Sequence, residues 1–345
     1  MSSVPIEFDV LSQSLQGNGT APLPRRRILC ATDLGFRSDR AVERAVLLAK
    51  QMNADVLFVH VVSDRQPERV LQLKANRARV RLMVQVDKLV ADKVMGCAPD
   101  FASVEIHIGK PLQVISQIAG EWNADLIVLA APVSRRYERL LGTTAERIIR
   151  SVACPVLIVN REPLAAYSRL AVATDLSATS ARVAQAIGRI GLLRDATAWF
   201  VHALDPPFKS LLRHEQPSAH QLELQKRRWQ KVVAAELTAQ LAGAELDLSR
   251  VRITAELAPP LEALEQIIEQ VNPELLVIGT SRWFLLKRML SLSIAHQLLR
   301  RVNCDILAVS PVSARREERK RRVDVLRITH GSKREALDSG PMLNI

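Results

Sequence analysis

The feature that most constrains this chain is an internal repeat that covers most of its length. The tetrapeptide ATDL begins at Ala31 and again at Ala173, and the pair VH begins at Val59 and again at Val201. Both pairs are 142 residues apart (173 − 31). A unit of roughly 140 residues has a normal domain size. Self-similarity at a fixed spacing therefore predicts a duplicated domain.

Each copy contains short apolar runs that alternate with helical patterns. The strands expected from these runs are 27–32, 55–62, 104–108, 126–130 and 156–159 in the first copy, and 169–174, 198–204, 251–257, 275–279 and 305–309 in the second. Short, continuous apolar runs are typical of strands buried on both faces of a parallel sheet. The alternation predicts two tandem α/β domains, each with a doubly wound, five-stranded parallel sheet.

The helical segments carry apolar residues at intervals of three and four. Ser38 is the expected N-cap of a helix that ends near Met52, and the corresponding helix of the second copy is expected over 179–193. The longest pattern, 68–95, has an apolar stripe that consists of Val70, Leu73, Val80, Val84 and Leu89. This helix and its counterpart at 218–241 are expected to cover the sheet, with a groove for a partner as the alternative.

The segments outside the repeat are polar or basic. Residues 1–24 are expected to form a flexible leader, the two domains to span 25–160 and 168–312, and residues 313–345 to form a basic, flexible tail. The formal net charge is +12, and much of it comes from this tail. An anion or nucleic-acid adaptor acting through the tail is one alternative function. Nucleic acid is not the expected partner, because the tail lacks interleaved aromatic residues and a recognised binding motif.

The sequence predicts a cytoplasmic protein with no membrane partner. No apolar run reaches the ~18 residues of a membrane span, and Glu7 and Asp9 interrupt any signal-peptide pattern. The four cysteines form no CxxC pair, and Cys30, Cys154 and Cys304 lie in or beside apolar strands. They are interpreted as buried thiols, and no metal site is expected.

Several short motifs, in one order, resemble the universal stress protein family. They are ATD followed by a nearby serine, VLFVHV, the turn from Gly109 to Pro111, ADLIVL, and GTTAER followed by CPVLIV. The second copy keeps part of this series. The resemblance implies a tandem member with two Rossmann-like, adenine-nucleotide-binding domains related by a pseudo-twofold axis. It further implies that the two domains pair through their last strands, and it leaves room for a homodimer of the whole chain.

The nucleotide-binding members of this family share the loop pattern G-x2-G-x9-G-[ST]. The leading glycines let the backbone approach a ligand, and the last glycine opens a phosphate cradle at a helix start. By resemblance, the candidate ligand-binding residues of the first domain are Asp33, Val61, Ala130, Gly142, Thr143 and Thr144. Those of the second domain are Asp175, Ala203, Gly279 and Ser293.

Neither copy keeps the full loop pattern. Ala130 and Val133 hold the leading glycine positions of the first domain, while Arg282 and Leu292 replace glycines in the second. A leucine where a phosphate must approach the backbone obstructs binding by its bulk and its poor solvation of charge. The second site is therefore the more damaged one, and ATP, if it binds, is expected in the first domain, which retains Gly142.

Two interpretations of Asp33 and Asp175 stay open at this point: a ligand for ribose or adenine, or a cap for the turn after a strand. His60 and His202 are expected to be core histidines. No nucleophile elbow or carboxylate pair indicates catalysis.

The sequence predicts a non-enzymatic binding or signalling module of the stress response, with other proteins or a small ligand as partners. The alternative is an ATP-binding sensor that uses the first domain, with slow hydrolysis.

Overall fold

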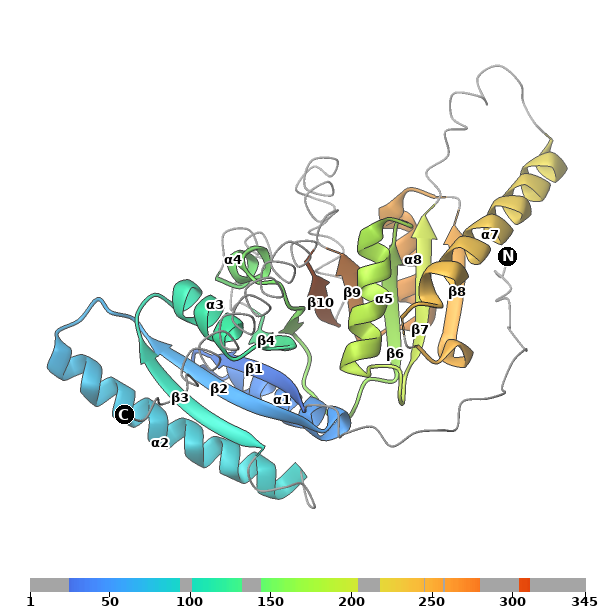
Figure 1. The fold of residues 1–345 in the computed structure, drawn as a ribbon. Helices are drawn as coiled ribbons and strands as arrows, with labels where there is room; N and C mark the ends of the chain where they lie inside the picture. Colours follow the sequence, from blue (N-terminus) through green and yellow to red (C-terminus); the bar gives the residue numbers. More distant parts are fainter. Residues whose placement is uncertain are drawn as a thin grey trace, which may run out of the picture.

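The computed structural model describes residues 25–93, 101–131, 144–203, 218–244, 246–256, 258–279 and 304–310. Within them the chain forms one sheet of ten strands with helices on both faces (Figure 1). The strand order is β3-β2-β1-β4-β5-β10-β9-β6-β7-β8. Pairing is parallel within each half, and one antiparallel pair, β5 with β10, joins the halves. The predicted fold of two five-stranded parallel units is therefore confirmed.

The elements of the first half are β1 (Arg26–Thr32), α1 (Ser38–Met52), β2 (Ala54–Val62), α2 (Glu68–Lys93), β3 (Ala102–Ile108), α3 (Pro111–Glu121), β4 (Leu126–Ala130), α4 (Thr144–Ser151) and β5 (Val156–Val159). Those of the second half are β6 (Arg169–Thr174), α5 (Ala178–Ile190), β7 (Thr197–Ala203), α7 (Ala219–Leu241), β8 (Val251–Glu256), α8 (Pro260–Val271), β9 (Leu275–Gly279) and β10 (Asp305–Val309), with a short 3-10 helix at Leu248–Arg250. The leader, the tail and the helix expected between β9 and β10 lie outside the described residues.

The strands form because both faces of the sheet are covered. Ile28 and Cys30 of β1 pack into the layer that contains α1, α2, α5 and α7. Leu29 and Ala31 point to the opposite face and pack against α3 and α4, while α8 covers this same face in the second half. Continuous apolar runs, rather than alternating ones, are what such a doubly covered sheet requires. No described helix is both long and apolar enough to cross a membrane.

α2 packs on the sheet through a different face from the predicted one. Four residues of the predicted stripe are exposed, namely Val70, Leu73, Val80 and Val84. The buried positions are Leu71, Ala78, Leu82 and Val86. Both sets follow helical spacing, so α2 has two apolar faces and only one of them contacts the sheet. The predicted Leu89 does pack against the core.

α5 starts and ends at recognisable capping residues. Its N-cap is Ser177, whose hydroxyl accepts the backbone N–H of Thr179 at 3.2 Å. Its end is Gly191, which adopts φ 72° and closes the helix before the predicted end at residue 193. A left-handed residue at this point favours glycine, because a Cβ would be strained there.

The two halves meet around the antiparallel pair β5 and β10, with Leu157 opposite Leu307 at its centre. Beside this pair, the fully buried Asp305 has partners on both carboxylate oxygens. Oδ1 accepts the backbone N–H groups of Asn160 (2.8 Å) and Arg161 (2.9 Å). These two residues open the linker between the halves, so Asp305 attaches the linker to β10.

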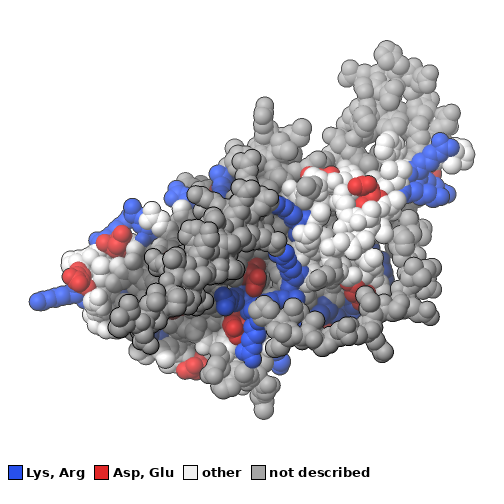
Figure 2. Space-filling model, in the orientation of Figure 1, with Lys and Arg blue, Asp and Glu red and all other residues white. Residues whose placement is uncertain are grey.

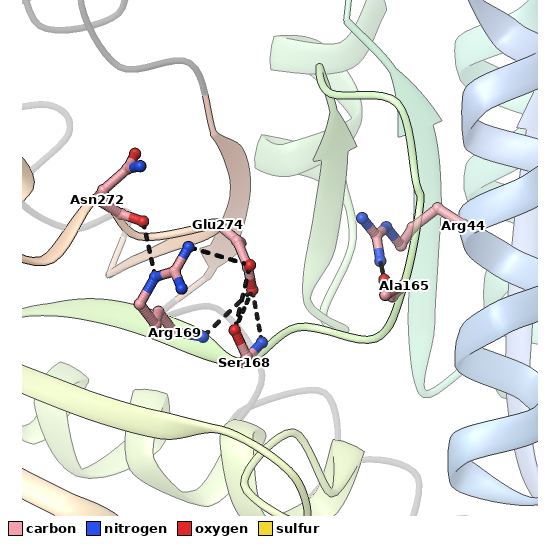
Figure 3. Close-up of polar contacts among 6 residues, drawn as sticks. All are labelled: Arg44, Ala165, Ser168, Arg169, Asn272 and Glu274. Atoms are coloured by element: carbon pink, nitrogen blue, oxygen red, sulfur yellow. Dashed lines mark hydrogen bonds and ion pairs between the residues drawn. The ribbon is translucent and has the colours of Figure 1, made fainter.

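The second oxygen of Asp305 binds a buried tyrosine and a buried arginine. Oδ2 accepts the hydroxyl of Tyr167 at 2.5 Å and lies 3.4 Å from Nε of Arg44 on α1. The guanidinium of Arg44 stacks on the Tyr167 ring, 4.0 Å from its centroid, and donates to the carbonyl of Ala165 at 2.7 Å (Figure 3). Burial raises the pKa of Tyr167 well above its usual value, so its hydroxyl keeps the proton that it donates. The cluster thus connects α1, the linker and β10.

An acidic residue before the fourth strand of each half fixes the start of the first strand. Glu274 accepts the backbone N–H of Ser168 at 2.6 Å and pairs with the guanidinium of Arg169 at 3.3 Å, as Figure 3 shows. At the equivalent place in the first half, Asp125 accepts the backbone N–H of Arg27 at 2.9 Å. The repeat is therefore preserved in polar contacts as well as in the strand order.

Candidate functional site

The chain reverses direction after β1 in a turn centred on Asp33. Oδ1 of Asp33 accepts the backbone N–H of Gly35 (2.8 Å) and the hydroxyl of Ser38 (2.6 Å). Ser38 is thus the first residue of α1 and not its N-cap as predicted, because its hydroxyl points back to Asp33; Arg37 holds the cap position. Leu34 adopts φ 62°, a left-handed conformation that is uncommon for a bulky residue.

The second half repeats this turn after β6. Leu176 has φ 60°, and Oδ1 of Asp175 accepts the backbone N–H of Ser177 (3.0 Å) and the hydroxyl of Ser180 (2.8 Å). In both halves, one carboxylate oxygen therefore caps the turn. Oδ2 of Asp33 has no hydrogen-bond partner among the described residues, which leaves it available to accept from a ligand.

A cavity of about 520 Å³ opens beside the turn of the first half. It lies at the carboxyl ends of β1, β2 and β4, which is where open α/β sheets bind ligands. Its volume falls within the range of small-molecule sites. The predicted residues that line it are Asp33, Val61, Ala130 and Thr144. Gly142 and Thr143 lie outside the described residues.

The cavity is lined by both apolar and polar residues. Leu129, Ile115 and Ile148 give it apolar walls, and the turn after β1 adds Asp33, Phe36 and Arg37. Phe36 is 69% exposed, with the Arg37 guanidinium 5.8 Å from the centroid of its ring. The sequence analysis missed Phe36. An aromatic residue directly after the glycine of the turn that follows β1 is the signal that could have indicated it.

The start of α4 forms one side of the cavity, through Thr144 and Ala145. The first N–H groups of a helix have no partner within the helix and carry the positive end of its dipole. Glu146 lies in this first turn, but its carboxylate pairs with Arg150 one turn later. The cavity is thus lined by the start of a helix, which attracts anions, by apolar residues and by the carboxylate of Asp33.

His60 and His202 each form a hydrogen bond with the last residue of the neighbouring strand, β1 and β6 respectively. Nδ1 of His60 lies 2.9 Å from the carbonyl oxygen of Thr32, and Nδ1 of His202 lies 3.1 Å from that of Thr174. A carbonyl oxygen only accepts, so Nδ1 carries the hydrogen in each case. Among the described residues, no group of three or more His, Cys, Asp or Glu side chains is placed to hold a metal ion.

The second half brings three of its predicted site residues to the same kind of place. Asp175 follows β6, while Ala203 ends β7 and Gly279 ends β9, and these three strands are neighbours in the sheet. The fourth predicted residue, Ser293, lies outside the described residues.

A close contact fills the space over Gly279. A Cβ built on Gly279 would lie 2.5 Å from the methyl carbon of Thr179, at the start of α5. The equivalent positions of the first half are Ala130 and Arg37, which line the open cavity. The two halves therefore differ where a ligand would meet the end of the fourth strand.

Of the three cysteines predicted to be buried thiols, Cys30 and Cys304 are buried, whereas Cys154 is only partly buried. Burial raises the pKa of Cys154 and of Cys304 to about 12. Because the thiolate is the reactive form, both thiols should resist iodoacetamide at about pH 8.5, near the usual thiol pKa. In urea they should react readily, as mass spectrometry of the labelled peptides would show. Rapid labelling of the folded protein would contradict this.

The raised pKa values of Cys154 and Cys304 also make the free energy of unfolding depend on pH. Because both thiols lose their protons more readily in the unfolded chain, the free energy of unfolding falls as the pH rises from about 9 to about 12.

The chain matches the model of the universal stress protein family twice, over residues 24–160 and 166–310. A universal stress protein of Methanocaldococcus jannaschii is 30% identical over 141 residues, which cover 39% of this chain and 82% of that protein. A putative universal stress protein of Staphylococcus aureus is 29% identical over 153 residues, which cover 43% of this chain and 92% of that protein.

Solved structures agree with this at the level of the fold. A universal stress protein from Archaeoglobus fulgidus gives a TM-score of 0.56 at 16% identity, covering 82% of this chain and 96% of that one. A functionally unknown protein from Pseudomonas aeruginosa gives 0.50 at 16% identity, covering 84% and 93%. The chain therefore belongs to the universal stress protein family, as a member with two family domains in tandem.

Proposed function

We propose that this protein is a non-enzymatic binding module of the stress response in the cytoplasm, with one ligand site, in its first domain. The observation that carries the proposal is the difference between the halves. The first has a cavity of about 520 Å³ at its strand ends. In the second, Thr179 packs against Gly279 at the equivalent position. Other proteins would then recognise whether this site holds a ligand.

The chemistry of the cavity favours an adenine nucleoside or nucleotide as the ligand. Its apolar walls suit a flat ring, and Oδ2 of Asp33 can accept a hydrogen bond from a hydroxyl or amino group. The start of α4 at Thr144 supports the second candidate function, an ATP sensor, because it can receive a phosphate. Tighter binding of ATP than of adenosine would favour the sensor.

Asp33→Asn tests the site with little change of shape. The amide oxygen can still cap the turn, but an NH₂ group replaces the free acceptor. We expect affinity for adenosine and ATP to fall about tenfold, as for the loss of a hydrogen bond to a charged group. Isothermal titration calorimetry measures this change.

Asp175→Asn is the matched control, since it alters the same turn in the second domain. It should leave both the affinity and the stoichiometry of one ligand per chain unchanged. Equal losses in both variants, or no binding heat from either compound with the parent protein, would refute the proposed site.

A further inference from the structure

The outer face of α2 carries apolar side chains exposed to solvent. Val70, Leu73, Val80, Met83 and Val84 are between 39% and 63% exposed. α2 packs along β3 at one end of the molecule (Figure 1). The residues of α2 that are buried against the sheet, Leu71, Ala78, Leu82 and Val86, belong to a different face of the helix. An exposed apolar face of this kind suggests an interaction surface.

Four of these residues form a seam with heptad spacing. Val70, Leu73, Val80 and Val84 follow the alternation of three and four residues at which two helices pack in a coiled coil, and Arg77 holds the remaining position. The α2 seam, as we name these five residues, spans two heptads, or roughly 21 Å along the helix. A seam of this length matches a helix better than a loop or a strand.

A basic row runs beside the α2 seam. Lys74, Arg81 and Lys88 are exposed and lie seven residues apart. In heptad terms all three occupy position e, which faces the flanking residues of a partner helix and sets the choice of partner. Acidic residues in the facing row would complement them.

The described side chains of the equivalent helix, α7, do not form such a seam. Among them, the exposed apolar residues are Leu224, Trp229 and Val232, and these three do not all fit one heptad register. α7 still packs on its part of the sheet, through Val233 and Leu237. Basic side chains do stand out at its exposed tip (Figure 2). Because α2 and α7 both cover the sheet, covering the sheet does not by itself require the α2 seam.

We propose that the α2 seam docks an amphipathic helix of a partner protein that has apolar residues at heptad spacing and acidic residues beside them. A second copy packed antiparallel fits poorly, because two such α2 helices would set the basic row, Lys74, Arg81 and Lys88, against itself. A lipid surface fits poorly as well. Interfacial helices insert a broad apolar face, whereas the seam is narrow and contains Arg77.

Two synthetic helical peptides of about three heptads provide the probe. Both carry leucine at the seam positions, and the flanking positions are glutamate in one peptide and lysine in the other. By fluorescence anisotropy with the full-length chain, the glutamate peptide should bind at least about tenfold more tightly. Its affinity should fall as salt rises.

Variants of both long helices locate the contact. Leu73→Glu with Val80→Glu should weaken binding at least about tenfold. The matched control, Leu224→Glu with Val232→Glu on α7, should leave it unchanged. Reversing the basic row with Lys74→Glu, Arg81→Glu and Lys88→Glu should transfer the preference to the lysine peptide.

Three outcomes would overturn the proposal. One is equal affinity for the two peptides, or a loss of peptide affinity that only the α7 variant causes. Another is self-association in analytical ultracentrifugation that the Leu73→Glu and Val80→Glu variant abolishes, because it would assign the seam to a second copy. The third is binding to phosphatidylglycerol vesicles without binding to either peptide.

Discussion

Replacing Asp305 with alanine is expected to lower the free energy of unfolding by about 3–5 kcal/mol, the usual cost of breaking a buried ion pair from one side. The change removes the acceptor of two linker N–H groups and leaves the buried guanidinium of Arg44 without its carboxylate. It also deprives the Tyr167 hydroxyl of its partner. Urea denaturation followed by circular dichroism measures the loss.

Two further variants separate this cause from general damage. Asp305→Leu with Arg44→Met replaces both charges by apolar groups, and it should be less destabilising than Asp305→Ala, because no charge stays buried and unpaired. Glu223→Gln breaks the exposed pair with Arg227 on α7 and should cost less than about 1 kcal/mol. If Asp305→Ala costs no more than Glu223→Gln, Asp305 does not anchor the two halves.

Adding a methyl group at Gly279 is expected to cost about 1–3 kcal/mol through overpacking. The new Cβ would lie 2.5 Å from the methyl carbon of Thr179. Relief requires the Thr179 side chain to leave its rotamer, or β9 and α5, which both pack into the core of the second half, to move apart. The reverse change in the first half, Ala130→Gly, should cost less than about 1 kcal/mol, mainly through backbone entropy.

A double-mutant cycle tests the cause of this loss. Thr179→Ser removes the methyl group that meets residue 279 but keeps the hydroxyl. In that background Gly279→Ala should be tolerated, so that the thermal denaturation midpoint of the double variant recovers most of the loss. Contacting residues give such coupling. Strictly additive losses would show that Thr179 is not the obstacle.

The strands were predictable because their signal is local. Leu126 to Leu129 and Leu275 to Ile278, for example, are short apolar runs at matching places in the two copies, and all are buried. Their order then follows from the α/β alternation. The family resemblance supplied the candidate residues at the strand ends, and the carboxyl ends of parallel strands share one edge of the sheet. That Asp33, Val61 and Ala130 bind a ligand stays a prediction.

Contacts made across the chain were not predictable. Asp305 binds the linker 145 residues away, and no local pattern marks an acidic residue at the start of a strand as an anchor. On α2, spacing alone could not decide between Leu82 and Val80, since both belong to apolar stripes. Only the position of the sheet selects the buried stripe, and that position depends on the tertiary fold.

The pairing of β5 with β10 has a genetic consequence. A dimer of identical subunits carries each substitution twice, once on either side of its axis. Here separate codons specify the two sides, so Ala130 and Gly279 can change independently. Because the halves are covalently joined, dilution does not separate them. Each molecule thus behaves as a permanent heterodimer made from one gene product, and it cannot exchange its unlike halves with another molecule by dissociation.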